Sequence, residues 1–77
     1  MTMPKQKFKA GAIAATVWGN ETLKEGEVVT YSTVSLDRSY KDKKTGEWKQ
    51  TNSLRVSDIP RATLVLNKAY EYLVLNG

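Results

Sequence analysis

The residues that could do chemistry in this chain are of few types, because the 77 residues include neither cysteine nor histidine. Thiolate and imidazole nucleophiles are therefore excluded, together with the metal sites that these side chains form. The acid–base groups that remain are Asp, Glu, Lys and Tyr, and none lies in a phosphate-binding glycine loop or an acidic calcium loop. We expect a protein that is not an enzyme and that holds no metal or cofactor.

The basic residues are concentrated in one part of the chain. The segment from Arg38 to Arg55 contains six basic and two acidic residues, and it accounts for the whole net charge of +4. Local positive charge of this kind attracts phosphate groups. A lysine-rich hairpin that is merely kept soluble by its charge explains the same numbers equally well. The aromatic residues are therefore needed to distinguish a nucleic-acid-binding hairpin from a solvated one.

Aromatic side chains are interleaved with these cations. Proteins hold single-stranded nucleic acid with a basic groove for the phosphates and aromatic rings on which bases stack. Trp48 could instead clamp the hairpin across its two strands, and Trp18 could be a core residue beneath the helix. The candidate nucleic-acid-binding residues are Trp18, Arg38, Tyr40, Lys41, Lys43, Lys44, Trp48, Lys49 and Arg55.

The elements that must position these residues are strands followed by one helix. Alternating residues rich in Val, Thr, Tyr and Ser predict strands at 7–9, 12–18, 28–41 and 48–56, with a turn at 43–46 and disorder at 1–6. The expected fold is a single α+β domain spanning 1–77. It consists of a curved antiparallel sheet of about four strands, with a long projecting hairpin, and one C-terminal helix (ββββα).

The pairing of the last two strands decides which residues share a face. A three-residue loop, 44–46, with Gly46 in the left-handed conformation, would place Leu36 opposite Leu54 and Val34 opposite Val56. The same register places Arg38, Tyr40, Trp48 and Gln50 on one face, and Lys41 and Lys49 on the other. The strand from 28 onward is too long for a compact body of this size, so the outer part of this hairpin is expected to bend or project.

The helix is predicted at 57–75. Ser57 or Asp58 can cap it, and Pro60 suits its first turn. Its sheet-facing stripe is expected to be Ile59, Ala62, Leu66, Ala69, Tyr70 and Leu73. Apolar residues also occupy other sides of the helix, and a small domain without disulfides or metals needs extra support. We therefore expect a homodimer formed through the helix, with an interface of Leu64, Val65, Lys68, Tyr72 and Leu75.

The order of elements, together with the runs at 34–42 (VSLDRSYKD) and 46–49 (GEWK), resembles a known family. This family is the single-stranded-DNA-binding domain of the transcriptional coactivator positive cofactor four, of which the plant Whirly proteins are larger relatives. The resemblance covers about residues 8–73. It implies a homodimer that grips unpaired DNA with little sequence preference, using positions that match Trp18, Arg38, Tyr40 and Lys49. A basic pair of the family falls near Asn52 and Ser53, which carry no charge.

The expected function is therefore largely sequence-independent binding of single-stranded DNA, with RNA as a second ligand, through a basic aromatic hairpin. The alternative is a protein-interaction or transcription-regulatory adaptor module that uses the exposed helix face or a sheet edge. No apolar stretch is long enough to cross a bilayer, and the eight residues 10–17 are a poor match to a secretory signal. A cytoplasmic protein is expected.

Overall fold

The computed structural model describes residues 2–76. The elements in chain order are β1 (Thr2–Ala10), β2 (Ile13–Lys24), β3 (Glu27–Lys41), β4 (Trp48–Thr51), a 3-10 turn η1 (Val56–Asp58) and the helix α1 (Ile59–Asn76). The strands form one antiparallel sheet in the order β1-β2-β3-β4. The expected α+β fold of ββββα order is confirmed.

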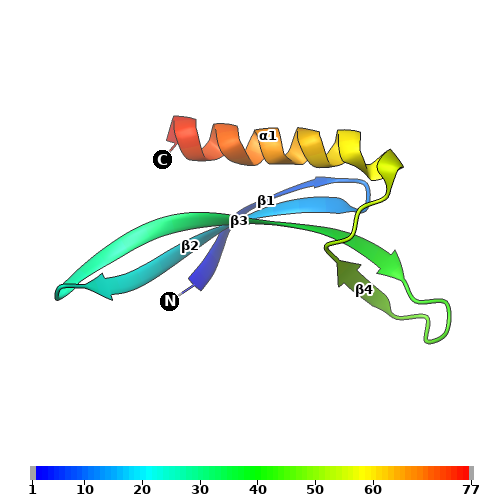
Figure 1. Ribbon diagram of the computed structural model, residues 1–77, viewed down its shortest axis with the longest axis horizontal. Helices are drawn as coiled ribbons and strands as arrows, with labels where there is room; N and C mark the ends of the chain where they lie inside the picture. Colours follow the sequence, from blue (N-terminus) through cyan, green and yellow to red (C-terminus); the bar gives the residue numbers. More distant parts are fainter. Residues whose placement is uncertain (1, 77) are drawn as a thin grey trace.

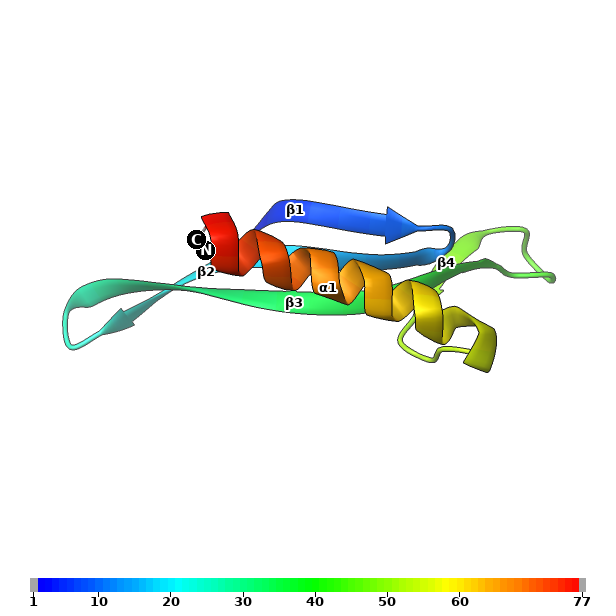
Figure 2. The ribbon, with the colours of Figure 1, turned by 90° about the horizontal axis from the view of Figure 1, so that it is seen from above.

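The sheet is arched, and α1 covers only one of its faces. Figure 1 shows α1 on the convex side of the arch, and no helix within residues 2–76 lies on the concave side. Seen from above, both hairpin tips extend past the ends of α1 (Figure 2). The molecule measures 49 × 28 × 16 Å along its principal axes, so the concave side is a long open surface.

The first three strands are longer than predicted. Residues 2–6, which we expected to be disordered, form the first half of β1. β2 continues through residues 19–24, where a polar connection was expected, and a two-residue turn joins it to β3. Glu25 and Gly26 in this turn have φ of 52° and 82°, the left-handed values that tight hairpin turns require. The β2–β3 end consequently projects farther past α1 than the β3–β4 end does (Figure 1).

The β3–β4 register differs from the predicted one by one residue. Asp42 and Glu47 close the loop, since the Asp42 N–H donates to the Glu47 carbonyl at 2.8 Å, so the loop has four residues. Gly46 does have a positive φ, 73°. Arg38 now pairs with Thr51 and Lys41 with Trp48. The strand ends at Thr51, and the predicted Leu36–Leu54 and Val34–Val56 pairs do not form.

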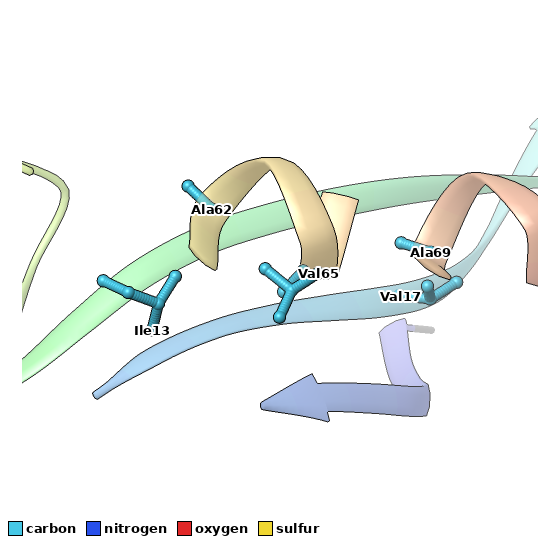
Figure 3. Close-up of a cluster of buried hydrophobic side chains, with 6 residues drawn as sticks. Ile13, Val17, Ala62, Val65 and Ala69 are labelled. Carbon is cyan, nitrogen blue, oxygen red and sulfur yellow. The ribbon is translucent and has the colours of Figure 1, made fainter. Parts of the chain in front are cut away.

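The core lies between α1 and the middle of the sheet. Buried residues of β2 meet the small side chains of the helix, and five of the six are labelled in Figure 3: Ile13, Ala15, Val17, Ala62, Val65 and Ala69. The small Ala62 and Ala69 let the helix approach the sheet closely. No helix within residues 2–76 has the length and apolar character needed to span a bilayer.

The helix is rotated about its axis relative to the prediction. Ala62, Ala69 and Leu73 face the core as expected, but Ile59, Leu66 and Tyr70 are exposed. Val65 is only 2% exposed, and Tyr72 packs edge-on against Phe8 with ring centroids 6.2 Å apart. Val65 and Tyr72 therefore belong to the core of the monomer rather than to a free interface. Leu64, Lys68 and Leu75 remain exposed on α1.

Candidate nucleic-acid interface

Trp18 lies on the concave face of the sheet. Side chains alternate along a strand, and Ile13, Ala15 and Val17 of β2 pack beneath α1, so Trp18 points to the opposite side. Its indole N–H donates a hydrogen bond to the Ser35 hydroxyl at 2.9 Å, which fixes the orientation of the ring. The structure thus excludes the interpretation of Trp18 as a core residue beneath the helix.

Trp48 lies on the same face, at the β3–β4 end of the sheet. It pairs with Lys41 across the β3–β4 ladder. Arg38 is paired with the core residue Ile13 and so faces α1, and alternation along β3 then places Lys41 and Trp48 on the concave side. Trp48 is 73% exposed. Trp18 is level with Thr33 of β3, so about 26 Å of strand separates the levels of the two tryptophans at 3.3 Å per residue. The concave face therefore carries Trp18 near the middle of the sheet and Trp48 at the β3–β4 end, with Tyr31 toward the β2–β3 end.

Lysines accompany the two tryptophans. Lys7 and Lys9 of β1 pair with Thr16 and Ala14 of β2, which places both lysines on the concave face, the same face as Lys41. Lys43 and Lys44 are exposed in the adjoining loop. Among residues 2–76, no carboxylate forms a salt bridge with any of these five lysines. Their charges are available to an external anion.

Lys7 and Lys9 were not among the predicted site residues. The alternation Lys7-Phe8-Lys9 contains the necessary signal, because Phe8 is drawn into the core against Tyr72 and its neighbours must then face the other way. The predicted strand there spans only residues 7–9, and the prediction did not assign its side chains to the two faces of the sheet.

Three predicted site residues lie on the convex face. Arg38, Tyr40 and Lys49 alternate with the concave residues, so Tyr40 and Trp48 do not share a face. The guanidinium carbon of Arg38 lies 5.7 Å from the centre of the Tyr40 ring. The Arg38 Nε donates to the Ser53 carbonyl at 3.2 Å. Arg38 therefore ties β3 to the segment that leads to the helix.

Asp58 binds both arginines of the predicted site. Its carboxylate, 2% exposed, accepts hydrogen bonds from the Arg55 backbone N–H at 2.9 Å and from the Arg55 Nε at 3.2 Å. The Arg38 Nε lies 3.4 Å from the same carboxylate oxygen. The hydrogen bonds from the Arg55 side chain and backbone hold the pKa of Asp58 below its ordinary 3.8, with the charge of Arg38 adding to this effect and burial opposing it. This ion pair anchors the start of α1.

Asp42 organises the charged loop. Its carboxylate accepts a hydrogen bond from the Lys44 N–H at 2.8 Å and lies 2.8 Å from the Lys49 Nζ. The hydrogen bond from Lys49, followed by that from the Lys44 backbone, lowers the pKa of Asp42, while burial opposes the change. Lys49 is thus neutralised by a neighbour, whereas Lys43 and Lys44 are not.

A hollow of about 610 Å³ adjoins Trp48 on this surface. It is lined by Lys9, Gly11, Ala12, Ser39, Trp48, Lys49 and Gln50. The acidic side chain of Asp37 also lies on the concave face, opposite Ala14. Its Oδ1 is buried and has no hydrogen-bond partner among residues 2–76. The surface therefore combines a basic margin with a polar centre.

No protein-family model, curated protein or solved structure matches this chain. Residues 2–76 contain no group of three acidic side chains placed to hold a metal ion. The support for a function comes from the residues of this chain and their placement.

Proposed function

We propose that this protein binds single-stranded nucleic acid across the concave face of its sheet, with DNA as the first ligand and RNA as the second. The observation that carries the proposal is the pair of tryptophans, Trp18 at the middle and Trp48 at the β3–β4 end of an open face whose lysines have no acidic partner within residues 2–76. Aromatic rings and unpaired cations on one surface are the two elements that single-strand binding requires.

The two kinds of side chain contribute differently. Each base that stacks on an aromatic ring contributes about 1–3 kcal/mol without selecting a sequence. Each phosphate neutralised by a lysine adds about 0.7 to the log–log dependence of the affinity on salt. Lys7, Lys9 and Lys41 lie beside the tryptophans, and Lys43 and Lys44 extend the basic surface into the loop. Arg38, Lys49 and Arg55 have acidic partners and serve mainly to hold the fold.

We also propose that the protein is a homodimer that forms through an uncovered flank. The flank comprises Ile59, Leu66, Tyr70 and Val74 of α1 together with Val34 of β3, all of them exposed. Val17 and Val34 are paired on the same face, yet Val17 is 0% and Val34 is 38% exposed. The helix packs mainly on β1 and β2, and β4 covers only residues 38–41 of β3. An apolar helix side therefore lies above a free strand edge.

Titration of the tryptophan fluorescence with an oligothymidylate at several salt concentrations tests the binding proposal. We expect saturable quenching and an affinity that falls as salt rises. The absence of quenching at micromolar strand and low salt would overturn the proposal.

Sedimentation analysis tests the dimer separately. We expect Leu66→Asp and Tyr70→Asp to give monomers, whereas Leu23→Asp, a control at an exposed leucine in the β2–β3 hairpin, remains dimeric. A wild-type chain that is monomeric at every concentration would overturn the homodimer and favour the adaptor alternative, in which another protein covers this flank.

A further inference from the structure

The hollow beside Trp48 arises where β3 changes partners. The pairing of β3 with β2 stops at Arg38, opposite Ile13, the first residue of β2, and the pairing of β3 with β4 starts at the same Arg38. Just beyond that point the Ser39 N–H bonds back to the β1–β2 hairpin, donating to the Ala12 carbonyl at 2.8 Å. The β1–β2 turn and β4 therefore stand on either side of Ser39. The space of about 610 Å³ between them is within the range of sites that hold small organic ligands.

The groups that line this hollow have unused hydrogen-bonding capacity. No hydrogen bond within residues 2–76 involves the Ser39 hydroxyl, the Gln50 amide or the Trp48 indole. Trp18 differs, since its N–H is bound to Ser35. Lys9 lies on the opposite wall without a salt bridge among the same residues. One aromatic surface and several free polar groups thus converge on one space.

We infer that this hollow is a base pocket that prefers a purine, an inference that rests on the proposed function. The base stacks on Trp48 with its edge toward Ser39 and Gln50. Lys9 donates hydrogen bonds to the base edge or to the adjoining phosphate. The lining is rich in donors, which suits the N7 acceptor that purines alone present. A glutamine amide pairs with N6 and N7 of adenine, and a lysine with O6 and N7 of guanine. The larger purine ring also covers more of the indole.

Competition between defined oligonucleotides tests the pocket. The probes are a thymidylate 12-mer and the same strand with one central adenine, guanine or cytosine. For the wild-type chain we expect adenine or guanine to raise the affinity on the order of 10-fold and cytosine to leave it unchanged. Gln50→Leu should lose most of the purine gain and bind the plain thymidylate within about twofold of the wild type. The control is Gln6→Leu. Gln6 pairs with Val17 and therefore lies on the convex face, away from the hollow, so this variant should behave as the wild type.

The outcomes separate this inference from the function on which it rests. Equal affinity for all four strands would overturn the purine pocket and leave single-strand binding standing. A Gln50→Leu chain that retains the full purine gain would also overturn it. Failure to bind any of the strands would instead overturn the proposed function. Because Gln50 is exposed, the variant should fold, and an unchanged thermal melting curve verifies this.

Discussion

The two ends of the sheet share the long strand β3 but are built in different ways. The β2–β3 hairpin, residues 20–31, is a regular ladder closed by a two-residue turn, and it carries three glutamates and one lysine. The β3–β4 hairpin, residues 38–51, has a short ladder and a four-residue loop, with five basic and two acidic residues. Alternating strand residues and a tight turn are sufficient to define the structure of the β2–β3 hairpin. Side-chain contacts of Asp42 and Arg38 are needed to shape the second.

This difference indicates where a polyanion would bind. The acidic β2–β3 end repels phosphate, whereas the β3–β4 end attracts it and presents Trp48. A single strand on the concave face is therefore expected to run from Trp18 toward the β3–β4 loop and to avoid the acidic tip. Substitutions made at each end separately test whether the two ends differ in function.

Reversing the charge at the basic end should have the largest effect. The triple variant Lys41→Glu, Lys43→Glu and Lys44→Glu removes up to three phosphate contacts, which amounts to about 100-fold weaker binding at 0.1 M salt. The matched variant Glu21→Lys, Glu25→Lys and Glu27→Lys changes the acidic end instead and should not weaken binding. Fluorescence titration of both variants is the measurement. Equal losses would mean that the two ends do not differ in function.

Removing the exposed ring at the basic end should come next. Trp48→Ala is expected to cost about 1–3 kcal/mol of binding free energy, since a stacking surface is lost. Its stability to urea should change little, because Trp48 is outside the core. The control is Tyr31→Ala, an exposed aromatic in the β2–β3 hairpin on the same face. A larger loss from Tyr31→Ala than from Trp48→Ala would contradict the placement of the ligand.

The ion pair at Asp58 predicts a pH dependence of stability. Its pKa is lowered in the folded state, mainly by Arg55, so its contribution to stability is fully present above the ordinary value of 3.8. This contribution is lost as the pH falls through the lower folded-state pKa. Asp58→Asn should have a lower free energy of unfolding than the wild type at pH 7, and this difference in free energy should be smaller at pH 2. Urea unfolding at both pH values measures it, and a gap independent of pH would contradict the assignment.

The two turn glycines should give the smallest effects and the most direct comparison of the ends. Gly26 and Gly46 have φ of 82° and 73°, and a Cβ atom at either would meet nothing within 4 Å. Alanine at each should therefore cost only the backbone strain, about 1–2 kcal/mol of stability. We expect Gly26→Ala to leave nucleic-acid affinity unchanged and Gly46→Ala to lower it slightly by disturbing the lysine loop. The opposite ranking would place the ligand at the acidic end.

The strand order and the helix could be predicted because each depends on local pattern. Alternation in β3 and the signals at Asp58 and Pro60 were sufficient for these elements. The pairing of β3 with β4 could not, because it depends on whether Lys43 closes a three-residue loop or Asp42 closes a four-residue loop. That single residue moves Trp48 to the face opposite Tyr40.

The sequence pattern also could not predict which side of α1 faces the sheet. Apolar residues surround α1, so periodicity alone does not separate the Leu66 and Tyr70 side from the Val65 and Tyr72 side. Close packing of Ala62 and Ala69 on β2 decides between them. The candidate residues Val65 and Tyr72 were consequently assigned to an interface although they belong to the core.

Mapping amide chemical shifts during titration with an oligothymidylate tests the central claim most directly. We expect the largest shifts on the concave face of the strands between the levels of Trp18 and Trp48 and in the loop at 43–46. Residues 21–30 and the exposed side of α1 should change little. Shifts concentrated in the β2–β3 hairpin tip or on the uncovered flank would contradict binding across the basic concave face.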